Sequence, residues 1–469
     1  MAGIQHVLLT DEQMRKFITE GYLILKTDFS AEFHRQLSDE LAKVYKEEGN
    51  PGNNLLPRIR ELQQVFDHPV VTGALTSVLG PDYMLHAHRH GHYNAQPKAG
   101  GWHKDSYWGY DKQRNHHPWW AMVMYFPQDT PPELGPTGIM PGTQNYESRL
   151  FKEDDDSREV TASGEAGTFA LIHYDIWHRS TPNLLGKSRF MLKFEFMRTA
   201  APTEPTWNNQ QPEWKLPAEL KAIDKQETMW EETWNWLSGR LGSVAGTRTA
   251  DEERIRELSG QLKNSYEPAA LNAAYELARL GRRGINALLT GLQSGNVLES
   301  RVSSYGLSVS GEDAIDGLKE LLTADTEETL RHAVFALGEQ RHLAARAVPS
   351  LIERLNHPSA AVRIAVTEAL GMIGSPPEEI VNGLIRCLRD EDTQVRFTAG
   401  LSLSRIGPSA ASAVPALEEA LEDDNRYVRA HAMEALRYIG TGQAKDLLIR
   451  KLFNSRWCTT TTPASTFYP

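Results

Sequence analysis

The stretch Trp102-His103-Lys104-Asp105 decides the fold of the first part of this chain. His103 and Asp105 stand two positions apart, so on an extended strand, or at its exit, both side chains leave on the same face and can converge on one ion. A third ligand must come from elsewhere. His178 supplies it, because it lies in a polar turn between two β-like runs. The pattern predicts a metal site of two imidazoles and one carboxylate.

Two imidazoles and one carboxylate on one side of an ion are typical of non-haem iron(II) oxygenases. The opposite side of the ion then stays open for a co-substrate and O2. A His-x-Asp pair arises often by chance in a chain of this length, so the pair alone is a weak signal. The assignment of a metal site therefore depends on the surrounding sequence.

Two β-like runs predict the scaffold around this site. Residues 119–126 are apolar on both faces, which indicates a central strand. In residues 190–197, large apolar side chains alternate with polar ones, so Arg189, Lys193 and Glu195 share the face opposite the phenylalanines. An arginine inside a barrel is costly without an anion. Many antiparallel strands with Gly/Pro turns predict a double-stranded β-helix, which is a cupin-like jelly roll.

Four features, in order along the chain, resemble the phytanoyl-CoA dioxygenase family of iron(II)- and 2-oxoglutarate-dependent oxygenases. They are residues 9–13 leading to Gly21-Tyr22-Leu23, then residues 102–105, then residues 135–143, then His178 through Arg189. One departure is Gln144, because family members often have histidine after this Pro-Gly-Ser/Thr turn. The resemblance covers about the first 200 residues, and it leaves the pocket near Gln144 less predictable.

The resemblance implies a cofactor set and roles for particular residues. His103, Asp105 and His178 would bind Fe(II), and 2-oxoglutarate and O2 would be co-substrates. Arg189, eleven residues after His178, would pair with the far carboxylate of 2-oxoglutarate, with Ser180 beside it. Relatives that halogenate lack the carboxylate ligand, so Asp105 favours hydroxylation of an aliphatic carbon, or a related desaturation or ring closure, with release of succinate and CO2.

A row of histidines, at positions 86, 88, 90 and 92, alternates with other residues and would share one face of a strand. A solvated or hydrogen-bonded face and a wall of the substrate pocket both remain open. A second metal site is the least favoured alternative, because the four span too far to serve one ion. Candidate substrate-binding residues are His90, His92, Tyr107, Trp108 and Trp120, although aromatic side chains here more often form a wall than take part in chemistry.

Composition limits the partners. The formal net charge is -11 and no block of Lys or Arg occurs, so nucleic-acid binding is not expected. Only Cys387 and Cys458 occur, which fits a reducing compartment. No signal peptide or long apolar run is visible, so we expect a cytoplasmic protein without a membrane segment. A small-molecule substrate and protein partners remain.

The second part of the chain repeats itself. Val362, Val395 and Val428 recur every 33 residues, each is followed by arginine, and each begins a helix that ends at a glycine. Ser359, Asp392 and Asn425 stand where N-caps are expected. A preceding helix recurs as well, so two helices per unit predict an α-solenoid that resembles HEAT repeats. Its role stays open between partner binding, self-association and bracing or capping of the enzyme.

We therefore predict a multidomain protein with four segments. They are an oxygenase domain with flanking helices at 1–205, a Pro/Trp-rich linker and connecting helix at 206–260, a HEAT-like solenoid at 261–456 and a loose tail at 457–469. The linker helix should carry a packing stripe of Trp230, Trp234, Leu237 and Leu241. With the linker as the only connection, the two domains should fold independently. The alternatives to a 2-oxoglutarate-dependent dioxygenase are a protein-binding scaffold with an inactive oxygenase-like domain and a metalloenzyme of other cupin-like chemistry.

Overall fold

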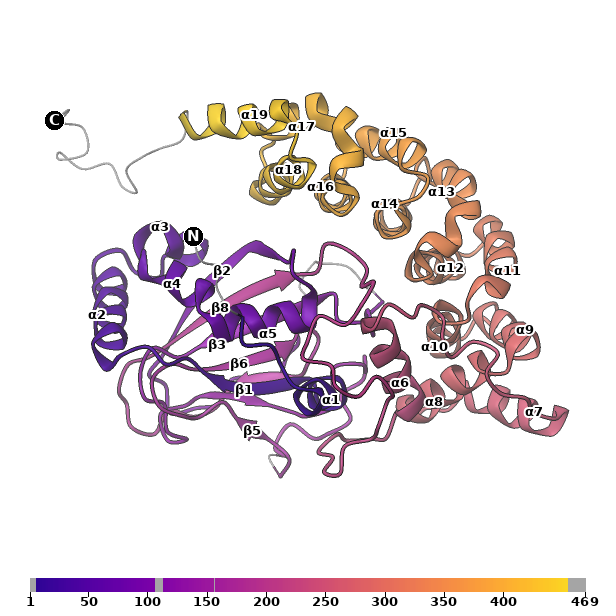
Figure 1. Cartoon of the computed structure of the whole chain (residues 1–469). Helices are drawn as coiled ribbons and strands as arrows, with labels where there is room; N and C mark the ends of the chain where they lie inside the picture. The colour runs from indigo at the N-terminus through magenta and orange to yellow at the C-terminus, as the bar shows by residue number, and fades with distance from the viewer. Residues whose placement is uncertain (1–5, 106–112, 156, 454–469) are drawn as a thin grey trace.

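The computed structural model describes residues 6–105, 113–155 and 157–453. Figure 1 shows two parts: a β-domain covered by helices, and an arc of helix pairs whose concave side faces that domain. The candidate residues Tyr107 and Trp108, the residue Cys458 and the tail at 457–469 lie outside the described residues.

Two antiparallel sheets form the β-domain, as the double-stranded β-helix prediction requires. The larger sheet has the order β1-β6-β3-β8-β2, and the smaller has the order β5-β4-β7. The strands are β1 (Tyr22–Lys26), β2 (Met84–Asn94), β3 (Trp120–Tyr125), β4 (Thr137–Ile139), β5 (Val160–Thr161), β6 (Thr168–His173), β7 (His178–Ser180) and β8 (Arg189–Met197). Strand β3 is fully buried at the centre of the larger sheet, which confirms the prediction from its two apolar faces.

Helices cover one face of the larger sheet, and the alternation in β8 explains how. Phe66 of α4 packs its ring on Phe194 and Phe196, with centroids 4.4 and 5.9 Å apart. The phenylalanine face of β8 therefore meets the covering helices, as predicted, and the Arg189 face is left for the interior. These helices are α1 (Asp11–Glu20), α2 (Ala31–Glu48), α3 (Leu55–Arg58), α4 (Glu61–Asp67) and α5 (Pro69–Leu79).

The first helix begins where the sequence places it. Thr10 accepts a hydrogen bond from the Gln13 backbone N–H, and the Gln13 side chain accepts one from the Thr10 backbone N–H. This is a complete capping box. Gly21 ends the helix in the left-handed conformation, with φ 78°, and turns the chain directly into β1.

The linker helix α6 (Glu227–Leu237) lies between the two parts and contacts both α1 and α8. Trp230 and Trp234 are buried, so the aromatic stripe is a packing surface. Trp234 packs edge-on against Trp207, with centroids 4.9 Å apart. The stripe is shorter than predicted: the helix ends at Leu237, so Leu241 is not part of it. Gly239, with φ 80°, follows the last turn and redirects the chain.

The second part is a right-to-left succession of stacked helix pairs in Figure 1, with an inner helix toward the β-domain and an outer helix away from it. The inner helices are α8 (Glu267–Ala278), α10 (Val297–Ser308), α12 (Glu327–Glu339), α14 (Ala360–Ile373), α16 (Thr393–Ile406) and α18 (Arg426–Ile439). The outer helices are α9 (Gly281–Leu292), α11 (Ile315–Glu320), α13 (Val348–Arg354), α15 (Pro377–Cys387), α17 (Val414–Ala420) and α19 (Gly442–Phe453), and α7 (Glu252–Gln261) precedes them. Each inner helix packs on the next, which confirms the α-solenoid.

The repeated caps are confirmed with one exception. Gly374, Gly407 and Gly440 follow the three repeat helices with φ of 65–66°. The side chains of Asp392 and Asn425 accept hydrogen bonds from the first turn, but Ser359 makes no such bond. Two of the three repeat arginines pair with an aspartate of the next repeat. These pairs are Arg363 with Asp390 and Arg396 with Asp423.

The concave side of the solenoid contacts the β-domain through buried polar side chains, so the expectation that the linker is the only connection is wrong. The two Nε2 atoms of His86 in β2 and His431 in α18 lie 3.1 Å apart. His117 Nδ1 lies 3.1 Å from Oε2 of Glu339 in α12. Further contacts join Asn115 to Glu339, His116 to Tyr275, Ser148 to Glu267 and Tyr438 to Asp82. These polar residues carry no periodic apolar signal, which is why the sequence did not predict the interface.

Trp119, just before β3, is the largest anchor of this interface. The Cζ of Arg341 lies 3.6 Å from the centroid of the indole ring, and the Cζ of Arg405 lies 5.5 Å from it. Arg341 adopts φ 56°, which L-residues rarely adopt. Two solenoid arginines thus contact the same β-domain indole.

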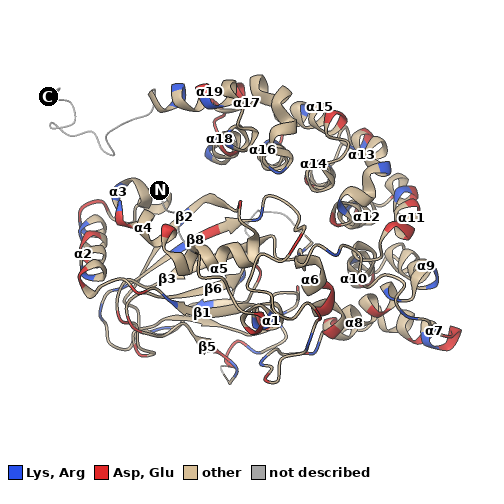
Figure 2. Cartoon of the chain, in the orientation of Figure 1, with Lys and Arg blue, Asp and Glu red and all other residues tan. Residues whose placement is uncertain are grey.

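Charged side chains of both signs are spread along the outer helices, as Figure 2 shows for α11 and α15. Among the described residues, no helix combines the length and the apolar character that crossing a bilayer requires.

Candidate metal centre

Two histidines that are far apart in sequence are brought side by side by a backbone bridge. The His103 N–H donates to the His178 carbonyl and the His178 N–H donates to the His103 carbonyl, both at 3.0 Å. An antiparallel pair of this kind places the two side chains on the same face. Their imidazole centroids are 4.4 Å apart. The polar turn that the sequence singled out is therefore the start of β7.

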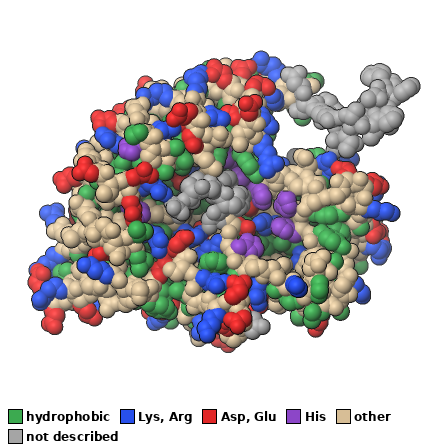
Figure 3. Space-filling model, turned by 180° about the vertical axis from the view of Figure 1, so that it is seen from behind, with side chains coloured by type: hydrophobic (Ala, Val, Ile, Leu, Met, Phe, Trp, Pro, Cys, Tyr) green, Lys and Arg blue, Asp and Glu red, His purple; other side chains and the backbone are tan. Residues whose placement is uncertain are grey.

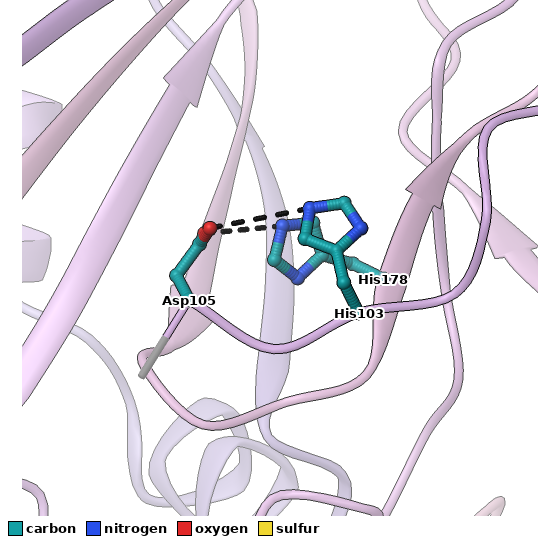
Figure 4. A group of neighbouring side chains, drawn as sticks. All are labelled: His103, Asp105 and His178. Atoms are coloured by element: carbon teal, nitrogen blue, oxygen red, sulfur yellow. Dashed lines mark ion pairs between the residues drawn. The ribbon is translucent and has the colours of Figure 1, made fainter. Parts of the chain in front are cut away.

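Asp105 completes the group, as Figure 4 shows. Its Oδ2 lies 3.1 Å from His178 Nε2, and its Oδ1 lies 4.0 Å from His103 Nε2. One ligand atom from each of the three residues lies within 4.8 Å of the others, and no other such group occurs among the described residues. The sequence thus predicted which three side chains converge.

Backbone hydrogen bonds orient both imidazoles for a metal. His103 Nδ1 donates to the Gly101 carbonyl at 3.0 Å, and His178 Nδ1 donates to the Ile176 carbonyl at 3.1 Å. Because a carbonyl only accepts, each ring carries its proton on Nδ1 and keeps a lone pair on Nε2. Burial also lowers the pKa of His103, which favours the neutral form that binds metals. This donor set, with neutral nitrogens and one carboxylate, suits iron(II).

Lys193 is a further residue of the site that sequence analysis did not assign. Its Nζ lies 2.9 Å from Asp105 Oδ2, and both side chains are buried. Burial alone would raise the pKa of Asp105, but the Lys193 ammonium opposes this effect and helps to hold the pKa well below its usual range. The available signal was the polar face of β8, which Lys193 shares with Arg189.

A cavity of about 190 Å³ opens beside the three residues and includes Arg189 in its lining. Arg189 is only 2% exposed, and its Nε donates to the Gly135 carbonyl at 2.9 Å. Its Nη1 is buried and has no hydrogen-bond partner within the described parts of the chain. Burial lowers the pKa of Arg189 to about 10, which still leaves it charged at neutral pH. A buried guanidinium with an unused N–H requires an acceptor, and a carboxylate fits best.

Polar neighbours of Arg189 line the same cavity. Ser180, a predicted site residue, lies there, and its Oγ accepts a hydrogen bond from the Gly100 N–H at 3.2 Å. Asn94 was not predicted. It pairs with Arg189 across β2 and β8, and its buried Nδ2 has no partner in the described ranges. Its position depends on the register of β2, which a bulge shifts, so the sequence pattern could not reveal it.

The histidine row divides at this bulge. The ring centroids of His88 and His90 are 5.7 Å apart and those of His90 and His92 are 5.1 Å apart, so these three follow one another along β2. His86 instead turns toward the solenoid. His92 lines the cavity together with the metal-binding candidates, whereas His90 is not among the described lining residues. The row is therefore partly a pocket wall.

The remaining candidates lie farther out. Trp120 is buried outside the described lining of the cavity, with its ring 5.6 Å from that of Tyr174 and 5.3 Å from that of His86. Gln144, the departure from the family pattern, donates from Nε2 to the Ile18 carbonyl and is buried against α1. It thus has a structural contact in place of a pocket role.

Comparison with protein families divides the chain as the structure does. Residues 8–191 match the family described as phytanoyl-CoA dioxygenase (PhyH). Residues 315–380, 348–437 and 381–456 match HEAT repeats. The comparison with curated proteins gives no match.

Solved structures resemble parts of the chain. A non-heme monooxygenase, ThoJ in its apo form, has 17% identity and a TM-score of 0.35, covering 44% of this chain and 86% of its own. HygX from Streptomyces hygroscopicus, with nickel and 2-oxoglutarate bound, has 14% identity and a TM-score of 0.35, covering 41% and 88%. A designed armadillo repeat protein in complex with a (KR)4 peptide has 18% identity and a TM-score of 0.30, covering 40% and 99%. Each covers less than half of this chain.

Proposed function

Because the chain joins a domain of the phytanoyl-CoA dioxygenase family to C-terminal HEAT repeats, we propose that it is an iron(II)- and 2-oxoglutarate-dependent dioxygenase. It hydroxylates an aliphatic carbon of a small-molecule substrate and releases succinate and CO2. The observation that carries this proposal is the convergence of His103, Asp105 and His178 beside a cavity whose lining includes the unsatisfied Arg189.

The three converging residues would hold the metal through His103 Nε2, His178 Nε2 and the Asp105 carboxylate. Arg189 would take the far carboxylate of 2-oxoglutarate, with Ser180 and the free amide of Asn94 beside it. Iron(II) with 2-oxoglutarate and O2 supplies the oxidising power for breaking an aliphatic C–H bond.

The chain itself contributes position and exclusion of water. The Gly101 and Ile176 carbonyls fix the tautomer and the orientation of the two imidazoles. Asp105 and Arg189 are both buried, so charges in the cavity interact in a medium less polar than water. Lys193 holds the carboxylate of Asp105 in place.

Succinate release by the purified protein tests this function. The protein is stripped with a chelator and reloaded anaerobically with Fe(II), and 2-oxoglutarate turnover is then measured after O2 is admitted. We expect succinate only when Fe(II), 2-oxoglutarate and O2 are all present, and we expect it even without the true substrate, through uncoupled turnover.

Three variants and one control sharpen the test. His103→Ala, Asp105→Ala and His178→Ala each remove one ligand and should abolish succinate release. His342→Ala removes an exposed histidine of the solenoid and should leave it unchanged. No succinate from the wild type, with intact folding, would instead favour the scaffold with an inactive oxygenase-like domain.

A further inference from the structure

A pair of buried histidines links the last inner helix of the HEAT array to the oxygenase domain. His86 lies in β2 and His431 in α18, and the Nε2 atoms of the two rings are 3.1 Å apart. Neither ring is exposed: His86 has 0% and His431 has 1% of its surface accessible. Two imidazoles buried together must share a defined hydrogen bond, because a buried polar group without a partner is destabilising.

The direction of that bond follows from the partners of the other nitrogens. His431 Nδ1 donates to the Phe397 carbonyl at 3.0 Å, so its Nε2 carries a lone pair. A hydrogen bond between the two rings therefore requires the proton on Nε2 of His86, whose Nδ1 lies 3.2 Å from the His88 backbone N and 3.3 Å from Glu195 Oε2. His86 therefore donates to His431. Burial lowers the pKa of both rings to about 3, so both are neutral at physiological pH.

His86 occupies the weakest point of β2. The strand lies at the end of the five-stranded order and, among the described strands, pairs only with β8; its register shifts between Leu85 and Arg89. A bulge of this kind leaves residues without ladder hydrogen bonds and bends the strand. The ladder therefore does not fix the backbone around His86, and contacts from outside the sheet must do so.

Helix α18 supplies those contacts on both sides of His86. The ring of Tyr427 lies parallel to that of His86, at 1° and 6.1 Å between centroids. The hydroxyl of Tyr438, at the other end of the helix, donates to the Asp82 carbonyl at 3.1 Å, just before β2 begins. α18 thus spans the start of β2 and the bulge, with His431 between the two contacts.

From the bulge, the strand leads into the candidate site. His88, His90 and His92 follow His86 along β2, and His92 lines the cavity next to His103 and His178. Glu195 Oε2, two residues beyond Lys193 on β8, lies 3.3 Å from His86 Nδ1. Figure 3 shows histidine side chains gathered at the rim of the hollow between the two parts of the molecule.

We propose that His431 of the HEAT array is a positioning residue for the oxygenase: it holds His86, and so fixes the bulged part of β2 that leads through His88 and His90 to His92 in the wall of the substrate pocket. The assignment of this wall to a substrate pocket rests on the proposed function, whereas the contact between α18 and β2 does not. The HEAT array is then a structural component of the site in addition to any partner that it binds.

Hydrogen–deuterium exchange on the full-length protein, loaded with Ni(II) and 2-oxoglutarate, tests the link. His431→Leu keeps the apolar volume and removes the acceptor, whereas His431→Gln offers a side-chain oxygen to His86 Nε2–H. We expect amides in residues 84–94 to exchange at least about tenfold faster in His431→Leu and near the wild-type rate in His431→Gln.

A matched control separates positioning from general loosening of the array. His332 is a buried histidine of the inner helix α12, bonded to Ser300 within the array. His332→Leu should leave exchange in residues 84–94 unchanged. Unchanged exchange there in His431→Leu, or equal acceleration in His332→Leu, would overturn the proposal.

The outcome is independent of the catalytic assignment. If the wild type fails to bind 2-oxoglutarate by calorimetry, the proposed function fails, while the exchange comparison can be made on the unloaded protein. If 2-oxoglutarate binds and His431→Leu retains that affinity within about threefold while β2 exchanges faster, the effect lies on the outer wall and not at Arg189.

Discussion

At the scale of single residues, Arg189 is the side chain that most clearly requires a bound anion. Its guanidinium is buried, makes one hydrogen bond to a backbone carbonyl and leaves Nη1 without a partner among the described residues. A dicarboxylate would satisfy it. Retaining such a cation without a bound anion would cost stability, so its presence favours a ligand in the cavity.

Arg189→Ala should therefore weaken 2-oxoglutarate binding by roughly 2–4 kcal/mol, or about a 30- to 1,000-fold rise in Kd, because a bidentate charge-assisted contact is lost. Calorimetric titration of the Ni(II)-loaded protein measures it. Lys187→Ala, an exposed cation two positions earlier, is the control. Wild-type affinity in the Arg189 variant would refute its assignment as the 2-oxoglutarate residue.

Glu232 of α6 offers a test of burial by pH. Its carboxyl is 1% exposed, and burial raises its pKa to about 8. Between the unfolded pKa, near 4.5, and about 8, the folded protein holds a proton that the unfolded chain has lost. The contribution of Glu232 to stability is thus fully present below the unfolded pKa and decreases as the pH rises from there to the folded pKa.

Glu232→Gln imitates the protonated carboxyl. Its free energy of unfolding should therefore rise relative to that of the wild type by about 1.4 kcal/mol per pH unit between pH 5 and 8. Urea unfolding at three pH values measures the difference. Glu231→Gln, on the same helix but paired with Arg279 and partly exposed, should show no such slope. If the free energy of unfolding depended on pH equally in Glu232→Gln and in the wild type, Glu232 would not be a buried neutral acid.

At the scale of elements, the sequence predicted what periodicity and spacing encode. The alternation in β8, the apolar run of β3 and the 33-residue repeat each follow from which face an element buries, and all are confirmed. The convergence of His103, Asp105 and His178 followed from spacing and from the resemblance to a known family. Their role as metal ligands stays a prediction.

Other features could not be predicted because they depend on register and on long-range contact. Asn94 faces Arg189 only because of the bulge near His86, and a bulge leaves no clear signal in composition. The helix ending at Leu237 instead of continuing to Leu241 reflects Gly239, whose positive φ outweighs the apolar stripe. The polar interface of α18 with β2 joins residues 345 positions apart.

The element around Trp119 can be tested directly. Trp119→Leu removes the ring that Arg341 and Arg405 cover, and should lower the free energy of unfolding by about 2–4 kcal/mol through lost burial and lost cation–π contacts. Urea unfolding of the full chain measures it. Trp214→Leu, a partly exposed linker tryptophan, is the control and should cost less. An equal cost in both would mean that the two arginines contribute nothing specific.

At the scale of the whole molecule, the shared interface changes what truncation is expected to do. The residues assigned to the site all precede residue 200, and the sequence alone predicts that a chain ending at Gly246 still binds iron and 2-oxoglutarate. The structure does not test that prediction, but it indicates that truncation lowers the stability of the remaining domain. Removing the solenoid would expose Trp119, His117 and His86, which are at most 3% exposed in the full chain.

We therefore expect the chain ending at Gly246 to melt at least about 10 °C below the full-length protein, because several kcal/mol of buried contacts are lost. Ni(II) with 2-oxoglutarate should still raise its Tm, since the ligands bind only the folded state. Scanning calorimetry of both proteins, with and without these ligands, measures both effects. An unchanged Tm would mean that the interface contributes no stability and that the solenoid serves partners alone. A lower Tm with no ligand response would mean that the solenoid is needed to assemble the cavity itself, because the shape of β2 around His86 then depends on α18.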